Sequence, residues 1–130
     1  MKSLGAQNPN LGKAIGAVAL SGIFAGGRFG SLDTGNGIER HRMRADSASP
    51  LSRNDGPAIQ MTEEDLQMTA SWGNSKAAQA WRAQQEELIA SGRFDDAIAM
   101  DIEDVTSKFP LTYDEAILMM IDDLPEGGTP

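Results

Sequence analysis

The sequence predicts an α+β domain, in which a small two-stranded unit is followed by a bundle of about three helices. Two short segments, residues 38–43 and 57–61, have the length and residue types of β-strands, and a loop rich in Ser, Asp, Asn, Pro and Gly joins them. Beyond residue 75, apolar residues recur every three or four positions, as they do on one face of a helix. A strand pair followed by helices is the order of elements found in an α+β domain.

The first predicted strand carries the only histidine of the chain. Successive side chains of a strand point to opposite faces. We therefore expect Arg40 and Arg42 on one face, and His41 and Met43 on the other.

Capping residues locate the first two helices. Thr62 suits a helix N-cap, with Asp65 as an imperfect capping-box partner, so a helix is expected over residues 63–70. Ser75 is placed to cap a longer helix over residues 76–91, which is followed by a glycine that favours a helix end.

The last two helices are expected in the C-terminal third. One begins at Asp95 or the residue after it and ends before Pro110. Thr112 and Glu115 have the spacing of a capping box for the other, over residues 113–124.

The tryptophans and the acidic pairs have plain structural interpretations. We expect Trp72 and Trp81 to anchor the core rather than to stack on bases. Three acidic pairs resemble metal ligands, but we expect them on exposed helix faces. They are Glu86 with Glu87, Asp95 with Asp96, and Asp122 with Asp123.

Charge is distributed unevenly along the 130 residues, whose net charge is −8. Residues 28–53 contain five arginines and three acidic residues, whereas residues 93–130 contain two basic and ten acidic residues. The basic stretch is a possible contact for phosphate, and the acidic end is suited to a basic partner. The absence of cysteine excludes disulfides and thiolate metal ligands.

Three segments are expected along the chain. Residues 1–37 are rich in glycine and suggest a linker, residues 38–124 the domain, and residues 125–130 a flexible tail. The apolar run AIGAVALSGIFA, residues 14–25, is open to three interpretations: a small helix or remnant of a preceding segment, the apolar part of a signal peptide, or a membrane contact. It is too short to span a bilayer as a helix.

From about residue 38 to residue 123, the chain resembles the C-terminal toxin domains of bacterial polymorphic toxins, in an HNH/endonuclease VII-like group of nucleases. The first strand of that group carries His-His-Met-Pro-Ala-Asp-Ser, where this chain has HRMRADS at residues 41–47. The loop and second strand carry Ser-Pro-Leu-Ser-Arg and Gly-Pro-Ala-Ile-Gln-Met, which recur at residues 49–53 and 56–61. The following helix carries Asp-His, where this chain has Asp65 and Leu66. The resemblance implies a ββα-metal-like unit.

The resemblance also assigns roles to three positions. In such nucleases one strand histidine holds a divalent metal of the Mg, Mn, Zn or Ni class, the next histidine is the general base, and a helix histidine completes the metal site. Here His41 keeps the metal position, Arg42 stands at the general-base position and Leu66 at the second metal position. Arginine cannot accept a proton near neutral pH, and leucine has no metal-binding atom. His41 alone would be a weak metal site.

The departures at positions 42, 44 and 66 are each one base change from the family's residue. They suit a decayed toxin, or one altered so that a host tolerates it.

Five arginines lie in or near the inherited motif: Arg40, Arg42, Arg44 and Arg53, with Arg28 before them. They can form a patch that binds nucleic-acid phosphates. They can equally mark an edge strand, where charges discourage pairing with another chain.

By its resemblance, the chain is an antibacterial DNase or RNase module at the end of a secreted toxin, delivered into a target-cell cytoplasm and neutralised by a cognate immunity protein. The replaced residues predict impaired catalysis. A non-catalytic module that binds nucleic acid or the immunity protein is an alternative, as is a small interaction protein that uses its acidic helices. Alone, the chain is expected in the cytoplasm, without a stable membrane span.

Overall fold

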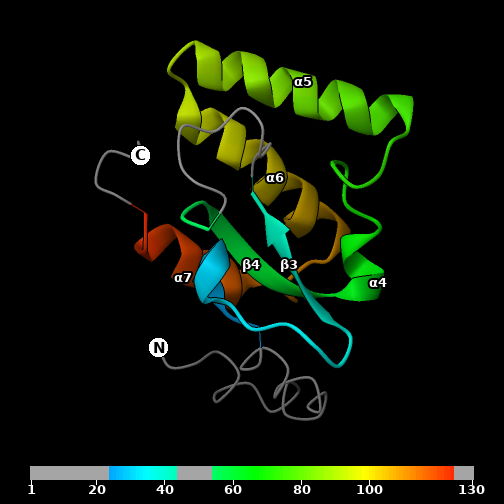
Figure 1. The fold of residues 1–130 in the computed structure, drawn as a ribbon, viewed down its shortest axis with the longest axis vertical. Helices are drawn as coiled ribbons and strands as arrows, with labels where there is room; N and C mark the ends of the chain where they lie inside the picture. Colours follow the sequence, from blue (N-terminus) through cyan, green and yellow to red (C-terminus); the bar gives the residue numbers. More distant parts are fainter. Residues whose placement is uncertain (1–23, 44–53, 125–130) are drawn as a thin grey trace.

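The computed structural model describes residues 24–43 and 54–124, where three short strands form an antiparallel sheet that packs with four helices (Figure 1). The strands are β2 (Gly26–Arg28), β3 (Ile38–Arg42) and β4 (Pro57–Thr62), in the order β2-β4-β3. The prediction of an α+β fold is confirmed. The sheet has three strands rather than the two expected, and β3 lies at its edge.

The additional strand lies in the segment that was expected to be a linker. Gly26 and Gly27 of β2 pair with Ile59 and Ala58 of β4. The 3-10 helix η1 (Phe29–Ser31) follows directly, and Phe29 is buried. The folded domain therefore begins before residue 38, which corrects the expected boundary. The rest of the apolar run, the loop with Arg44 and Arg53, and the tail lie outside the described residues.

The predicted alternation along the first strand is observed. His41 pairs with Ile59, whose side chain belongs to the main core, and Met43 is buried in that same core. Arg40 and Arg42 occupy the alternate positions of β3, so they lie on the other face of the sheet, over η1.

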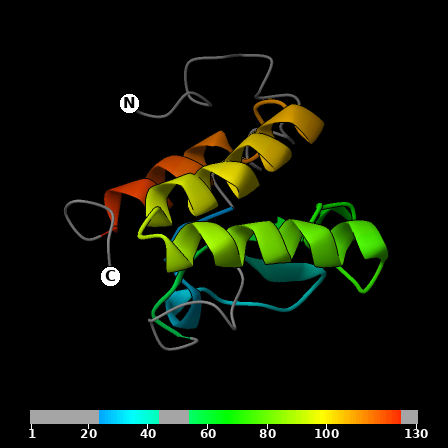
Figure 2. The same ribbon diagram turned by 90° about the horizontal axis from the view of Figure 1, so that it is seen from above.

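The long helices α5 (Lys76–Ala90) and α6 (Phe94–Lys108) form a pair, and α7 (Asp114–Asp122) packs against β2 and β4 (Figures 1 and 2). The main core lies between the sheet, α6 and α7, and it includes Ile59, Met61, Val105 and Met120. No helix in the described ranges is long and apolar enough to cross a membrane.

The caps of α4 (Glu63–Leu66) and α5 agree with the sequence pattern. The Thr62 hydroxyl accepts a hydrogen bond from the Asp65 amide at 3.1 Å, and the Ser75 hydroxyl accepts one from the Ala78 amide at 3.0 Å. The first of these helices is shorter than predicted, because the Ala70 amide donates to the Asp104 carboxylate at 2.8 Å instead of continuing the helix.

The predicted capping box before α7 is wrong. Tyr113 is the N-cap of that helix and its side chain makes no capping bond. Its buried hydroxyl instead donates to Asp65 Oδ2 at 2.7 Å and accepts from the Thr62 amide at 3.2 Å. Tyr113 therefore joins the start of α4 to α7 across the core.

We expect Tyr113→Phe to lower the free energy of unfolding by about 1–3 kcal/mol, because it leaves the Thr62 amide and the Asp65 carboxylate without their buried partner. Thr112→Ala is the matched control, and its effect should be close to zero because Thr112 is exposed and caps nothing. Urea unfolding of the two variants measures both effects. A larger loss for Thr112→Ala would restore the capping box.

Candidate functional site

The residues that the sequence assigns to the site come together at one hollow of about 260 Å³, beside the edge strand β3. His41 and Arg42 line it from β3, and Leu66 lines it from the end of α4. Arg40 also contributes. Positions that are 24 or more residues apart in the sequence therefore converge on one place.

The hollow also contains side chains that the sequence did not assign to a site, among them Trp72 and Arg82. Trp72 is 48% exposed, so the expectation that it anchors the core is wrong. Trp81 is partly buried, and its indole N–H donates to Asp101 Oδ1 at 2.9 Å. Nothing in the sequence pattern distinguishes the two tryptophans, because the exposure of Trp72 depends on how its loop is held.

The residues that line the hollow carry a net positive charge. Its lining among the described residues contains Arg40, Arg42 and Arg82 and no aspartate or glutamate, although the whole chain has a net charge of −8. A bound anion would be attracted by the net positive charge of these residues, and this attraction would weaken as salt is added.

The ring of Phe29 contacts two of these arginines. The guanidinium carbons of Arg40 and Arg42 lie 4.0 and 3.9 Å from the centre of its ring, and Arg40 Nη1 donates to the Phe29 carbonyl at 3.0 Å. The aromatic face attracts both cations. It thereby restricts the positions of both side chains.

His41 is 3% exposed, and it lines the hollow from the core side of the sheet. Burial lowers the pKa of its imidazole from 6.5 to about 4; the Asp104 carboxylate opposes this lowering and Arg42 adds to it. The side chain is therefore neutral at physiological pH. Its Nε2 atom has no hydrogen-bond partner among the residues that the structure describes.

Two buried carboxylates of α6, Asp101 and Asp104, form hydrogen bonds to α5 and to the loop after α4. Asp101 accepts from Trp81 and from Gln85 Nε2, the latter at 2.8 Å, and Asp104 accepts from the Ala70 amide. Burial raises the pKa of Asp101 from 3.8 to about 7, although the bonds from Trp81 and Gln85 oppose the rise and Asp104 adds to it. These side chains connect α5, α6 and the loop after α4.

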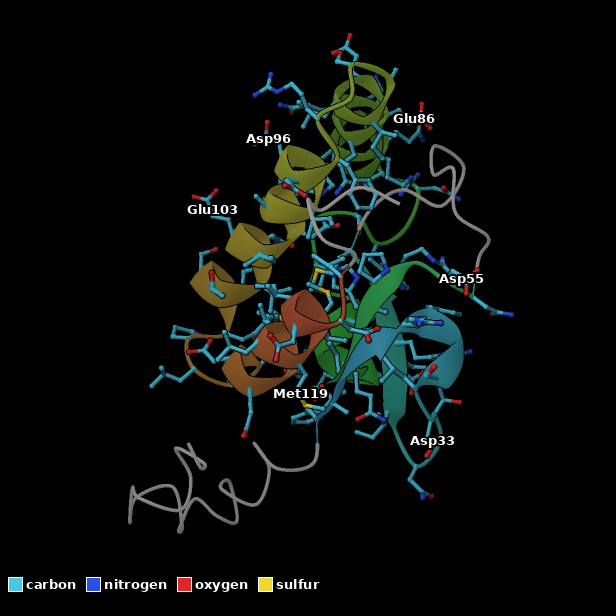
Figure 3. All side chains as sticks on the ribbon, turned by 90° about the vertical axis from the view of Figure 1, so that its left-hand side faces the viewer. Asp33, Asp55, Glu86, Asp96, Glu103 and Met119 are labelled. Atoms are coloured by element: carbon cyan, nitrogen blue, oxygen red, sulfur yellow. The ribbon has the colours of Figure 1, made fainter. Side chains whose placement is uncertain are left out.

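The acidic pairs singled out in the sequence are exposed, as expected. Glu86 and Asp96 project outward from α5 and α6 (Figure 3). None of these residues lines the hollow.

The metal that the resemblance implies does not fit the residues present. His41 is the only metal-binding side chain of the three assigned positions, because Arg42 is a cation and Leu66 is a hydrocarbon. In residues 24–43 and 54–124, no group of three His, Cys, Asp or Glu side chains is placed to hold an ion. Arg42 also cannot serve as the general base that the resemblance assigns to its position.

Two larger hollows, of about 400 and 720 Å³, are both lined by Arg28 and Asp123, which form an ion pair, and by other residues of β2 and α7. Their charges are mixed, since Asp55, Asp122 and Asp123 face a single arginine. They bring none of the assigned site residues together, so the smaller basic hollow is the candidate site.

Comparisons with family models, with curated proteins and with solved structures give no match to this chain.

Proposed function

We propose that this chain is a nucleic-acid-binding domain, built on a strand, loop, strand and helix unit of the HNH nuclease type and lacking its hydrolytic groups. The observation that carries the proposal is the basic hollow at which His41, Arg42 and Leu66 meet. In the nucleases that the sequence resembles, the corresponding strand and helix positions share one site. Their convergence here supports a common origin for the unit.

Binding without hydrolysis follows from the residue types. Arginine contacts to phosphate provide affinity that is independent of sequence and sensitive to salt, and they need no catalytic group. Half-buried Arg40 and Arg42, stacked on Phe29, supply guanidinium groups of the kind that make such contacts. We expect a dissociation constant on the order of 10⁻⁴–10⁻⁶ M at physiological salt.

Titration of a labelled duplex at several salt concentrations tests the proposal. Arg40→Gln with Arg42→Gln should weaken binding and reduce the slope of log affinity against log salt by about two, because two phosphate contacts are lost. Arg28→Gln with Arg93→Gln changes the net charge equally at exposed positions outside the hollow, so it should leave most of the slope in place. Identical binding curves for the two double variants would show that the hollow does not bind nucleic acid.

A nicking assay with supercoiled plasmid and Mg²⁺, Mn²⁺, Zn²⁺ or Ni²⁺ separates binding from cleavage. The unaltered chain should cleave no faster with metal than without it. Arg42→His with Leu66→His restores the two family residues and tests whether the position of the site is right. Fast metal-dependent cleavage by the unaltered chain, lost in His41→Ala, would contradict the proposal.

A second candidate is a module that binds a protein, such as a cognate immunity protein. It is favoured by exposed apolar side chains on α7: Leu118 is 60% exposed, Met119 45% and Ile121 44%, and Figure 3 shows Met119 pointing outward. Leu118→Ser with Ile121→Ser should not change the duplex titration if the hollow is the functional site. If the arginine variants also leave that titration unchanged, the protein-binding function is the better candidate.

A further inference from the structure

Trp72 has an exposed side chain and lies on a loop whose backbone is hydrogen-bonded to both long helices. Arg82 Nη1 donates to the carbonyls of Ser71 and Gly73, at 2.6 and 2.8 Å, and so fixes the backbone on both sides of the tryptophan. Gly73 has a φ of +88°, which a residue with a side chain rarely adopts. The turn that carries Trp72 is therefore fixed by the two bonds from Arg82 and by the backbone conformation at Gly73.

α6 holds the earlier part of the same loop. Asp104 accepts from the Ala70 amide at 2.8 Å, and Lys108 Nζ donates to the Met68 carbonyl at 2.9 Å. Lys108 also forms an ion pair with Asp104 at 2.7 Å. The backbone from Met68 to Gly73 is thus bonded to both long helices. An exposed ring on such a support loses little conformational freedom when a ligand stacks on it.

His41 supplies a second, independent indication of a ligand. The residue is 3% exposed, it lines the same hollow, and its Nε2 atom is buried and lacks a partner among the described residues. An unsatisfied buried nitrogen is costly, and a ligand that hydrogen-bonds to it removes the cost. Depending on the tautomer, this nitrogen donates or accepts one hydrogen bond.

We propose that the hollow binds one unpaired nucleotide of a single strand, with its base stacked on Trp72, its phosphate attracted by the arginines that line the hollow, and a polar group at His41 Nε2. This inference rests on the proposed function and names its substrate class. The hollow of about 260 Å³ lies near the lower end of small-molecule sites, as suits one nucleotide. Paired bases are stacked on their neighbours in a duplex, so the indole face is available only to an unpaired base.

Binding of octathymidylate, octauridylate and a duplex of equal length, at one salt concentration, tests the inference. The single strands should bind about tenfold more tightly than the duplex, which is the size of effect that one base stacked on an aromatic ring produces. Trp72→Leu should remove this preference and leave the salt-dependent duplex binding in place. The two single strands differ in the sugar and in the 5-methyl group of the base, and tight binding of either supports the inference.

Met68→Leu is the matched control, because Met68 is 57% exposed on the same loop and Lys108 contacts only its backbone carbonyl. It should leave single-strand affinity unchanged. Tryptophan emission gives a second readout: single strands should quench the wild-type protein but not Trp72→Leu, in which the hydrogen-bonded Trp81 is the only remaining indole.

The outcomes separate this inference from the proposed function. Salt-dependent binding that is equal for single strands and duplex, and unaffected by Trp72→Leu, overturns the stacked nucleotide and leaves the nucleic-acid-binding function standing. Absence of binding to every nucleic acid overturns both. Loss of single-strand preference in Met68→Leu to the same extent as in Trp72→Leu would attribute the effect to the loop in general, and would also overturn the inference.

Discussion

Gly26→Ala should unfold much of the protein population at temperatures where the wild type is folded. A methyl group at position 26 would overlap the carbonyl oxygen of Ala116, and it would lie 2.9 Å from the carbonyl carbon of Ala116 and 3.0 Å from the Met120 amide nitrogen. These are backbone atoms of α7, so relief requires the whole helix to move away from β2. We expect a loss of about 3 kcal/mol or more, at the upper end for an overpacked core.

Thermal unfolding followed by circular dichroism measures this loss, which should lower the melting temperature by about 10 °C or more. Ser31→Ala, at an exposed position shortly after β2, is the control and should change little. Gly26→Ala with Ala116→Gly should be no more stable than Gly26→Ala alone, because the colliding oxygen belongs to the backbone. Rescue by Ala116→Gly would place the conflict in the side chain instead.

The second large effect is a pH dependence of the free energy of unfolding, which we expect in variants of Asp101 and His41 but not in the wild type. The folded state raises the pKa of Asp101 from 3.8 to about 7, so between these values the folded protein binds more protons than the unfolded chain, and stability falls as pH rises. The folded state lowers the pKa of His41 from 6.5 to about 4, so the folded protein binds fewer protons there, and stability rises with pH. The two effects largely cancel in the wild type.

Substitution of either residue should leave the pH dependence of stability that the other residue produces. Asp101→Asn should become more stable from about pH 4 to 6.5, and His41→Gln should become less stable from about pH 4 to 7, each by about 2–4 kcal/mol. Urea unfolding at pH 4.5, 5.5 and 6.5 measures these slopes. Asp95→Asn, an exposed position of the same helix, should run parallel to the wild type. If Asp101→Asn also runs parallel, the carboxyl does not titrate as its burial implies.

Local patterns predicted much of the fold because the interactions concerned are local. The alternation of Arg40 and His41 across β3, and the caps at Thr62 and Ser75, involve residues within a few positions of each other. β2 was not predicted, because a Gly-Gly-Arg segment has no strand pattern of its own. It forms because its glycines allow α7 to approach and because β4 offers a free edge for pairing.

The candidate site was predictable only in part, and for a related reason. The resemblance named His41, Arg42 and Leu66, which the structure brings to one hollow. It did not name Trp72 or Arg82, since the exposure of the first and the position of its loop depend on hydrogen bonds from distant helices. The end of α4 was misplaced for the same reason, because Asp104 takes the Ala70 amide from a position 34 residues away.

The place of β4 between two partners has a consequence for any attempt to cut the domain at residue 38. Such a fragment loses β2 and turns the central strand into an open edge, where the backbone groups of buried Ala58 and Ile59 face solvent. Exposed edges of this kind, rich in apolar residues and poor in charge, recruit strands from other molecules. We therefore expect β2 to limit aggregation by covering this edge, so insoluble product from the shorter fragment would reflect the loss of β2 rather than a property of the whole domain.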